Sequence, residues 1–168
     1  GHLWHNGNKI ILEENRDSLD GIYAPFLIHE KTLEFIEKNK ENLFFCYVPT
    51  IIPHAELIAP EKYIQLFRNK FLPEKVFEGC DPGCDRYRTG GYRSQTESHA
   101  AFAAMVYLLD EQVGQIVKKL EELGISDNTI IMFSSDNGPH LEGGADPDFF
   151  NSNGSLKGYK RDFYEGGI

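Results

Sequence analysis

Apolar residues recur at steps of three and four over a long stretch in the second half of the chain. This spacing puts them on one face of an α-helix. A helix is therefore predicted over 97–123, with an apolar stripe of Phe102, Met105, Leu109, Val113, Ile116, Leu120 and Leu123. Ser94 or Thr96 is expected to cap its first turn, and Gly124 is placed to end it. The stripe is expected to face the core.

Two further helices are predicted ahead of this one. Residues 24–40 have an amphipathic pattern, and Pro25 lies in the first turn, where its missing amide costs no hydrogen bond. A short helix is expected over 61–69. It lies inside a stretch rich in proline and glycine, 60–95, which is predicted to be a long loop, and long ordered loops often carry function.

Two short runs are almost wholly apolar. LFFCYVPT, residues 43–50, and NTIIMFSS, residues 128–135, have the length of strands, and their composition predicts strands that are covered on both faces. Because the helix over 97–123 lies between them, they form a predicted parallel crossover unit. Residues 1–23 are expected to be irregular, apart from a possible short strand at Ile10–Leu12.

Polar side chains follow both predicted strands. In sheets of this kind, ligands bind beyond the carboxyl ends of the strands. His54 lies just after the first strand, and Asp136 and Asn137 lie just after the second. A carboxylate beside an amide offers the hard oxygen ligands that calcium or magnesium takes. On spacing alone, however, Asp136 could equally cap a turn, and His54 could be an exposed loop residue.

Composition narrows the class of protein and of partner. With 168 residues, of which 40% are hydrophobic, the chain is long enough for one globular domain. The net charge of −9 argues against nucleic acid as a partner, so an anionic substrate would have to be met by a few placed cations or by a metal. No run of eighteen apolar residues predicts a membrane span, and the opening residues lack the apolar segment of a signal peptide.

The three cysteines lead to different expectations. Cys46 lies in an apolar run and is expected in the core. Cys80 and Cys84 flank a polar Asp-Pro-Gly turn, so a local disulfide, a free pair and a metal pair all stay open. Since there is no second cysteine pair, a zinc site of the usual four ligands is not completed by cysteine.

Three segments together resemble the sulfatase family. FFCYVPTIIPHAEL is similar to the family's apolar strand that ends in a proline and a sulfate-binding histidine. IIMFSSDNGPH is similar to its metal-binding strand end, and LKGYKRDFYEGGI to the stretch that carries its active-site lysine. The segment 97–135, which contains LLDEQVG, also matches the family's pattern. The motifs occur in the family's order, and the resemblance covers most of the chain from about Ala24.

The resemblance implies a fold, an activity and a site. The fold would be the α/β, alkaline-phosphatase-like fold of sulfatases, with a central, mostly parallel sheet flanked by helices. The activity would be that of a sulfuric ester hydrolase of the arylsulfatase-like kind. Asp136 and Asn137 would be calcium ligands, and His54 would bind the sulfate or protonate the leaving oxygen. Lys160, rather than Lys157, falls on the family's lysine position. His140 would bind substrate rather than act as a catalytic residue.

Parts of the family's pattern are absent from these residues. Sulfatases use a formylglycine nucleophile made from a cysteine or serine in a C-x-P-S-R motif, and neither Cys46 nor Cys80 lies in such a motif. The paired aspartates that open the metal site and the Gly-Lys-Trp-His segment are missing as well. Residues 1–168 are therefore expected to be a single partial domain, an internal segment of a sulfatase N-terminal catalytic domain that is inactive alone.

Two other functions stay open. A phosphodiesterase or phosphonate hydrolase of the same superfamily would need more histidine and aspartate ligands than this segment supplies. A non-catalytic sulfatase-like protein that binds glycans would need no nucleophile. The expected partner is a sulfate-ester small molecule or a sulfated carbohydrate, with loops 71–95 and 141–155 beside the pocket. The resemblance also implies a periplasmic or extracellular location.

Overall fold

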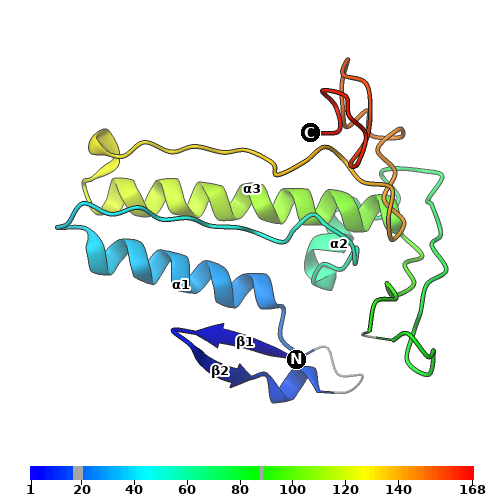
Figure 1. The fold of residues 1–168 in the computed structure, drawn as a ribbon, viewed down its shortest axis with the longest axis horizontal. Helices are drawn as coiled ribbons and strands as arrows, with labels where there is room; N and C mark the ends of the chain where they lie inside the picture. The colour runs from blue at the N-terminus through cyan, green and yellow to red at the C-terminus, as the bar shows by residue number, and fades with distance from the viewer. Residues whose placement is uncertain (17–20, 88) are drawn as a thin grey trace.

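The computed structural model describes residues 1–16, 21–87 and 89–168. Its regular elements are β1 (His2–His5), β2 (Asn8–Ile11), α1 (Ala24–Asn39), α2 (Glu61–Phe67) and α3 (Ser98–Glu122), with single 3-10 turns at Glu13–Asn15 and Ser126–Asn128. Helices α1 and α3 lie side by side, and α2 packs on α3 near its amino-terminal end (Figure 1). The three predicted helices are thus confirmed, with boundaries that differ by one or two residues.

The core lies where α2 and the loop before it pack on the first half of α3. Its buried apolar side chains are Ile52, Leu57, Ala59, Tyr63, Ile64, Ala100, Ala101, Ala104, Met105, Leu108 and Ala145. Three of these are alanines of α3, whose small side chains let the neighbouring backbone come close. Hydrogen bonds tie α1 to α3, from His29 to Gln115 at 2.8 Å and from Gln112 to the Pro25 carbonyl at 3.4 Å. None of the described helices has the length and hydropathy that a membrane crossing requires.

The start of α3 is capped by a residue that is far away in the sequence. The predicted caps, Ser94 and Thr96, are wrong: the N-cap position is Glu97, which makes no side-chain cap. Instead, the Glu74 carboxylate accepts hydrogen bonds from the first free amides of the helix, those of His99 at 2.9 Å and Ala100 at 3.2 Å. A carboxylate at this end also complements the helix dipole.

The chain opens with a β-hairpin that the sequence pattern did not predict. β1 and β2 pair antiparallel, with His2 opposite Ile11 and His5 opposite Asn8. Asn6 and Gly7 form the turn and both have positive φ angles, 49° and 80°. Asn-Gly is the preferred pair for such a two-residue turn, so the signal was present in the sequence. Residues 17–20, part of the stretch expected to be irregular, lie outside the described residues.

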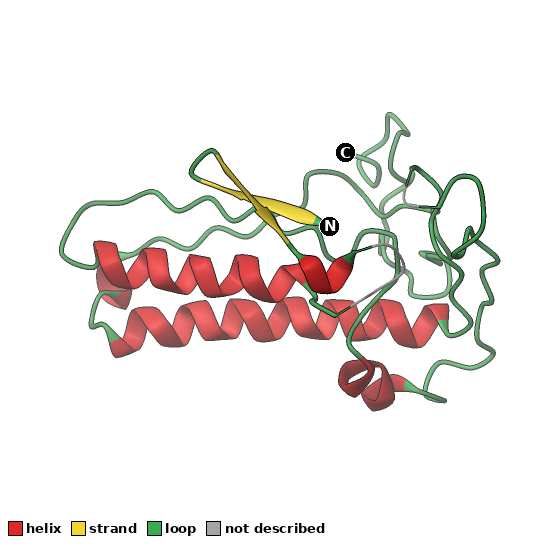
Figure 2. Cartoon of the chain, turned by 90° about the horizontal axis from the view of Figure 1, so that it is seen from below, coloured by secondary structure: helices red, strands yellow, loops and turns green. Residues whose placement is uncertain are grey.

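The two predicted central strands are extended but unpaired. Residues 43–50 and 129–135 run in the same direction along α3, on the same side of the helix layer (Figures 1 and 2). They are in no sheet, and the hairpin is the one sheet among the described residues. The expectation of cover on both faces is wrong, because Phe45 is 86% exposed and Met132 is 91% exposed. Strand assignment requires a hydrogen-bonded neighbour, and neither run has one in the described part of the chain.

Two of the three cysteines form a disulfide, and the third is a free thiol. Cys80 and Cys84 form a disulfide, which resolves the alternatives left open for this pair. Cys46 is a free thiol and is only half-buried, so its expected place in the core is wrong. It lies in the extended run 43–50, where exposed and half-buried side chains alternate over 43–48.

Truncating the core of α3 should cost much more than truncating its outer face. Leu108 is 1% exposed, whereas Val106, two residues earlier, is 42% exposed. We expect Leu108→Ala to lower the free energy of unfolding by about 2–5 kcal/mol, because it removes buried methyl groups and leaves a cavity. Val106→Ala should cost less than about 1 kcal/mol. Urea unfolding followed by circular dichroism measures both, and equal losses would contradict this packing.

Candidate active site

His54 and Lys160 are in direct contact although 106 residues separate them in the chain. The Lys160 Nζ lies 3.0 Å from His54 Nε2. The other ring nitrogen, Nδ1, lies 2.7 Å from the carbonyl oxygen of Ala55. A carbonyl can only accept, so Nδ1 carries the proton and Nε2 is left to accept a hydrogen bond from the Lys160 ammonium. The contact thus fixes the tautomer of a neutral imidazole.

Backbone contacts bring Lys160 to the end of the run 129–135. The amide of Lys160 donates to the Pro139 carbonyl at 2.9 Å, and the amide of Gly138 donates to the Gly167 carbonyl at 3.2 Å. The two segments approach so closely that a Cβ on Gly138 would lie 1.8 Å from the Gly166 carbonyl oxygen. Glycine is therefore required at this crossing, because any side chain would push the segments apart.

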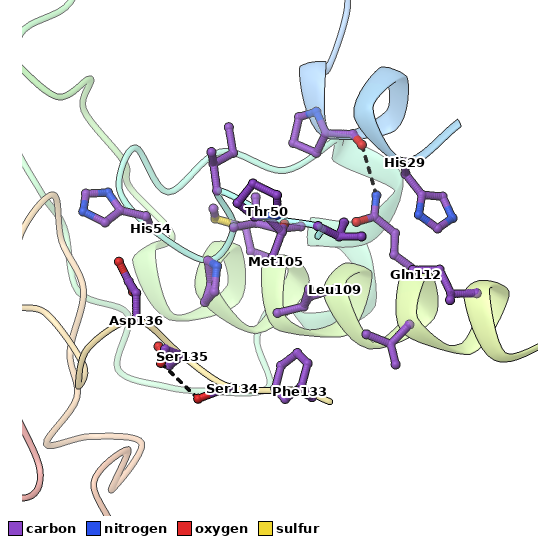
Figure 3. A pocket seen from close by; sticks show the side chains of 18 of the residues that line it. His29, Thr50, His54, Met105, Leu109, Gln112, Phe133, Ser134, Ser135 and Asp136 are labelled. Carbon is purple, nitrogen blue, oxygen red and sulfur yellow. Dashed lines mark hydrogen bonds between the residues drawn. The ribbon is translucent and has the colours of Figure 1, made fainter. Parts of the chain in front are cut away.

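Asp136 and Asn137 lie at the same cavity as His54. Both line it, and Figure 3 shows Asp136 and His54 on the two sides of its end. The Asn137 side-chain amide donates a hydrogen bond to the Asp136 carboxylate. Asp136 is exposed, and no side-chain cap by it is seen, so the turn-capping alternative has no support in the described contacts.

The described residues supply only part of a metal site. Calcium takes six to eight oxygen ligands, and Asp136 and Asn137 offer donors of the right chemistry at one point. The Asn137 amide would have to turn its oxygen, rather than its nitrogen, toward the ion. Among the described residues, no group of three or more histidine, cysteine, aspartate or glutamate side chains could hold a metal. The two residues fit a calcium ion in kind, as part of a larger ligand set.

His140 stacks on His54. The ring centroids are 4.8 Å apart and the rings are tilted by 25°. The Nδ1 of His140 accepts the backbone N–H of Glu142 at 3.2 Å. Burial lowers the pKa of His140 below its ordinary value, and the neighbouring His54 acts in the same direction. The Pro53 carbonyl acts in the opposite direction and raises the pKa of His140.

Four residues that the sequence analysis did not single out hold His54 and His140 in place. The Tyr92 ring meets the His54 ring edge-on at 6.4 Å. Gly143, whose φ is +62°, lets the chain pass so close that a Cβ there would lie 2.6 Å from the Cβ of Ala55. Arg161 and Glu142 form an ion pair at 2.6 Å beside His140. Nothing in the spacing of these residues marks them, because their roles depend on contacts between distant segments.

The site therefore consists of the Lys160 ammonium and the His54 imidazole, next to oxygen atoms that could bind a metal. Helices and extended segments hold these groups in place. This arrangement places an ammonium, an imidazole and two oxygen donors close to one cavity. The sequence profile of the Sulfatase family matches residues 17–168, and the chain belongs to this family.

Comparisons with known proteins agree with this assignment. The chain is 28% identical to an uncharacterised sulfatase of Schizosaccharomyces pombe, a match that covers 80% of this chain and 28% of that protein. It is 29% identical to an N-acetylgalactosamine-6-O-sulfatase of Bacteroides thetaiotaomicron, over 98% of this chain and 26% of that one. An ulvan-active sulfatase of Formosa agariphila is 31% identical over 80% of this chain. The chain thus spans little more than a quarter of the length of these relatives.

A solved structure confirms the fold class. The crystal structure of Ps i-CgsB in complex with k-i-k-neocarrahexaose superposes with a TM-score of 0.68 at 27% identity. The match covers 99% of this chain and 29% of that one. The α/β fold of sulfatases is thereby confirmed for these residues, although the described residues pair only the small hairpin.

Proposed function

We propose that these residues are part of a sulfuric ester hydrolase and that His54 and Lys160 hold the sulfate group of its substrate. One observation carries the proposal: the 3.0 Å contact between the Lys160 ammonium and His54 Nε2, at a cavity also lined by Asp136 and Asn137. Family membership supports the reaction class, and the Lys160 ammonium beside His54 supports an anionic ligand.

The pair has the chemistry that sulfate-ester cleavage needs. When the ester bond breaks, negative charge grows on the leaving oxygen and stays on the non-bridging oxygens. The Lys160 ammonium would donate to one of these oxygens, and such preorganised donors lower the barrier. His54 would pass a proton from Nε2 to the leaving oxygen and be left as the neutral imidazole, while Lys160 stays charged. His140, which stacks on His54, would contact the part of the substrate next to the sulfate.

The remaining groups of the reaction would come from outside residues 1–168. Asp136 and Asn137 would supply two ligands of a calcium ion, which when bound would offset the charge of the sulfate oxygens. The nucleophile is proposed to be a formylglycine elsewhere in the complete polypeptide. On its own, the 168-residue chain is expected to bind but not to cleave.

A sulfated carbohydrate is the proposed class of substrate. Two relatives carry names that refer to galactosamine 6-O-sulfate and ulvan, and the solved structure was determined with a neocarrahexaose. A periplasmic or extracellular location is also proposed. The Cys80–Cys84 disulfide supports it, because disulfides persist in oxidising compartments.

The activity and the metal can be tested together. We expect the complete polypeptide that contains these residues to release sulfate from 4-nitrophenyl sulfate or a sulfated oligosaccharide. Asp136→Ala should lower kcat/KM by at least about 100-fold and weaken calcium binding in isothermal titration calorimetry, because it removes the charged ligand. Asp127→Ala, in the turn after α3, is the matched control and should change neither. Cleavage of phosphate diesters but not sulfate esters would overturn the proposal.

A further inference from the structure

A disulfide closes the long loop that precedes α3. It joins Cys80 to Cys84, and the Cys80 amide donates a hydrogen bond to the Tyr92 carbonyl at 2.7 Å. The packing here leaves no room for side chains at two glycines. A Cβ on Gly79 would lie 2.2 Å from the Tyr92 carbonyl oxygen, and a Cβ on Gly91 would lie 2.6 Å from the Cβ of Cys80. The disulfide therefore lies directly against the backbone that carries Tyr92.

The base of this loop is tied to the segment that carries His54. Phe77 and Gln95 exchange two backbone hydrogen bonds, at 2.8 and 2.9 Å. The side-chain amide of Gln95 donates to the Leu57 carbonyl at 2.8 Å, and Leu57 is a buried residue three positions after His54. The loop 77–95 is thus held at its base as well as by the disulfide, so its place relative to His54 is fixed.

The side chain of Tyr92 lies between His54 and the chain at Gly143. Its ring meets the His54 ring edge-on, with centroids 6.4 Å apart and an angle of 62° between the planes. On another side, a Cβ on Gly143 would lie 3.5 Å from the Tyr92 Cγ. Contacts between rings at such angles are directional, because the positive edge of one ring faces the negative face of the other. A half-buried Tyr92 can therefore fix the direction in which the imidazole points.

This contact becomes important when a ligand binds. The His54 ring contacts the Ala55 carbonyl, the Lys160 ammonium, the His140 ring and the Tyr92 ring. If a sulfate group takes the ammonium, as the proposed function requires, the contact with Lys160 is lost. The single hydrogen bond to Ala55 lets the imidazole pivot, and the stack on His140 lets it slide in its own plane. Tyr92 restricts both movements.

We propose that Tyr92 is a positioning residue for His54 and that the Cys80–Cys84 disulfide holds Tyr92 in place. The inference rests on the proposed function, in which His54 Nε2 must stay directed at the leaving oxygen. It gives a role to the long loop and to two cysteines that take no direct part in the site.

Two substitutions at position 92 of the complete polypeptide separate positioning from substrate binding. Tyr92→Ala should lower kcat for 4-nitrophenyl sulfate by about 10- to 100-fold, the usual effect of a small misplacement of a catalytic group. KM should change by less than about threefold, because Tyr92 contacts His54 rather than the substrate. Tyr92→Phe keeps the ring and should keep kcat within about threefold of the unmodified enzyme. Thr89→Ala, at an exposed position of the same loop, is the control and should change neither constant.

Two kinetic outcomes would contradict the proposal. One is a loss in Tyr92→Phe as large as in Tyr92→Ala, and the other is a loss that appears in KM alone. In either case the tyrosine would act on the substrate itself. If Tyr92→Ala unfolds early in a thermal scan, Tyr92→Leu, which fills the space without a ring, replaces it with the same expected results.

Nuclear magnetic resonance of the His54 ring gives a readout that needs no sulfatase activity. Long-range ¹H–¹⁵N spectra of the complete polypeptide, assigned with His54→Gln, show which ring nitrogen carries the proton. At a pH where the ring is neutral, the unmodified protein and Tyr92→Phe should show the Nδ1–H form, whereas Tyr92→Ala should show a mixture of both tautomers. If no sulfate ester is cleaved, the proposed function fails, and this spectrum still decides whether Tyr92 holds the ring. An unchanged spectrum in Tyr92→Ala would refute the positioning role.

Removal of the disulfide tests the second part of the proposal. Cys80→Ser combined with Cys84→Ser should change kcat and the tautomer in the same direction as Tyr92→Ala. The change should be smaller, because the hydrogen bonds at the base of the loop 77–95 remain. If both readouts match the unmodified protein, the disulfide does not hold Tyr92.

Discussion

Lys160→Ala in the complete polypeptide is expected to lower kcat/KM for a sulfate ester by about 100- to 1,000-fold, the usual loss when one preorganised donor to a developing oxyanion is removed. The Lys160 ammonium touches His54 Nε2 at 3.0 Å, so the change removes a positive charge and also the partner that holds the imidazole. Sulfate release from 4-nitrophenyl sulfate, measured over a range of substrate concentrations, gives kcat and KM separately.

Lys157→Ala is the matched control for this prediction. Lys157 is three residues away, is exposed, and lies over the Tyr164 ring at 4.0 Å rather than at the site. Its removal should change kcat/KM by less than about fivefold, since it takes away only an exposed cation–π contact of about 0.5–1 kcal/mol. Equal losses in the two variants would mean that the segment 157–160 acts through its fold, or that the lysine position has been assigned wrongly.

Gly138→Ala is expected to damage both the fold and the site. The new Cβ would lie 1.8 Å from the Gly166 carbonyl oxygen, and neither backbone can yield without separating Pro139 from Lys160. We expect a loss of about 1–3 kcal/mol in the free energy of unfolding, the usual cost of overpacking. Activity should fall as far as in Lys160→Ala, because the ammonium moves away from His54.

Gly114→Ala distinguishes this clash from a general effect of replacing glycine. Gly114 lies in α3, and a Cβ there would meet nothing within 4 Å. The change should stabilise the protein by up to about 1 kcal/mol, because alanine is the better helix former. Thermal unfolding of the two variants decides the matter. If Gly138→Ala unfolds no earlier than the unmodified protein, residues 138 and 166 are not in contact.

The helices could be predicted from the sequence because the spacing of apolar residues is local information. The stripe predicted the length of α3 to within two residues. Its inner face was predicted only in part, because Met105 and Leu120 are buried whereas Leu109, Val113 and Ile116 are half-buried. Its cap could not be predicted, because Glu74 reaches the helix from 25 residues away. The Asn6-Gly7 turn was a local signal that went unused, and the hairpin was missed with it.

For the runs 43–50 and 129–135, the sequence predicted an extended conformation but not the surroundings. An apolar run predicts that a segment will be covered on both faces, but it does not say which part of the chain covers it. The site has the same limit. The order of strand and polar residues placed His54 and Asp136 at one edge, but only the resemblance to sulfatases singled out Lys160. The contact between Lys160 and His54 depends on the crossing at Gly138, which leaves no mark in the spacing of residues.

The hydrogen bond between Lys160 and His54 also bears on selectivity. The ammonium and the imidazole are hydrogen-bonded to each other at 3.0 Å, so a ligand that binds the ammonium must first break this contact. A charged sulfate oxygen can replace the imidazole as the partner of the ammonium and recover what is lost. An uncharged analogue of the same shape, such as a sulfonamide, recovers less, since hydrogen bonds to charged groups are about twice as strong as neutral ones. If His54 and Lys160 hold the sulfate group as proposed, their contact would disfavour neutral analogues relative to charged sulfate esters.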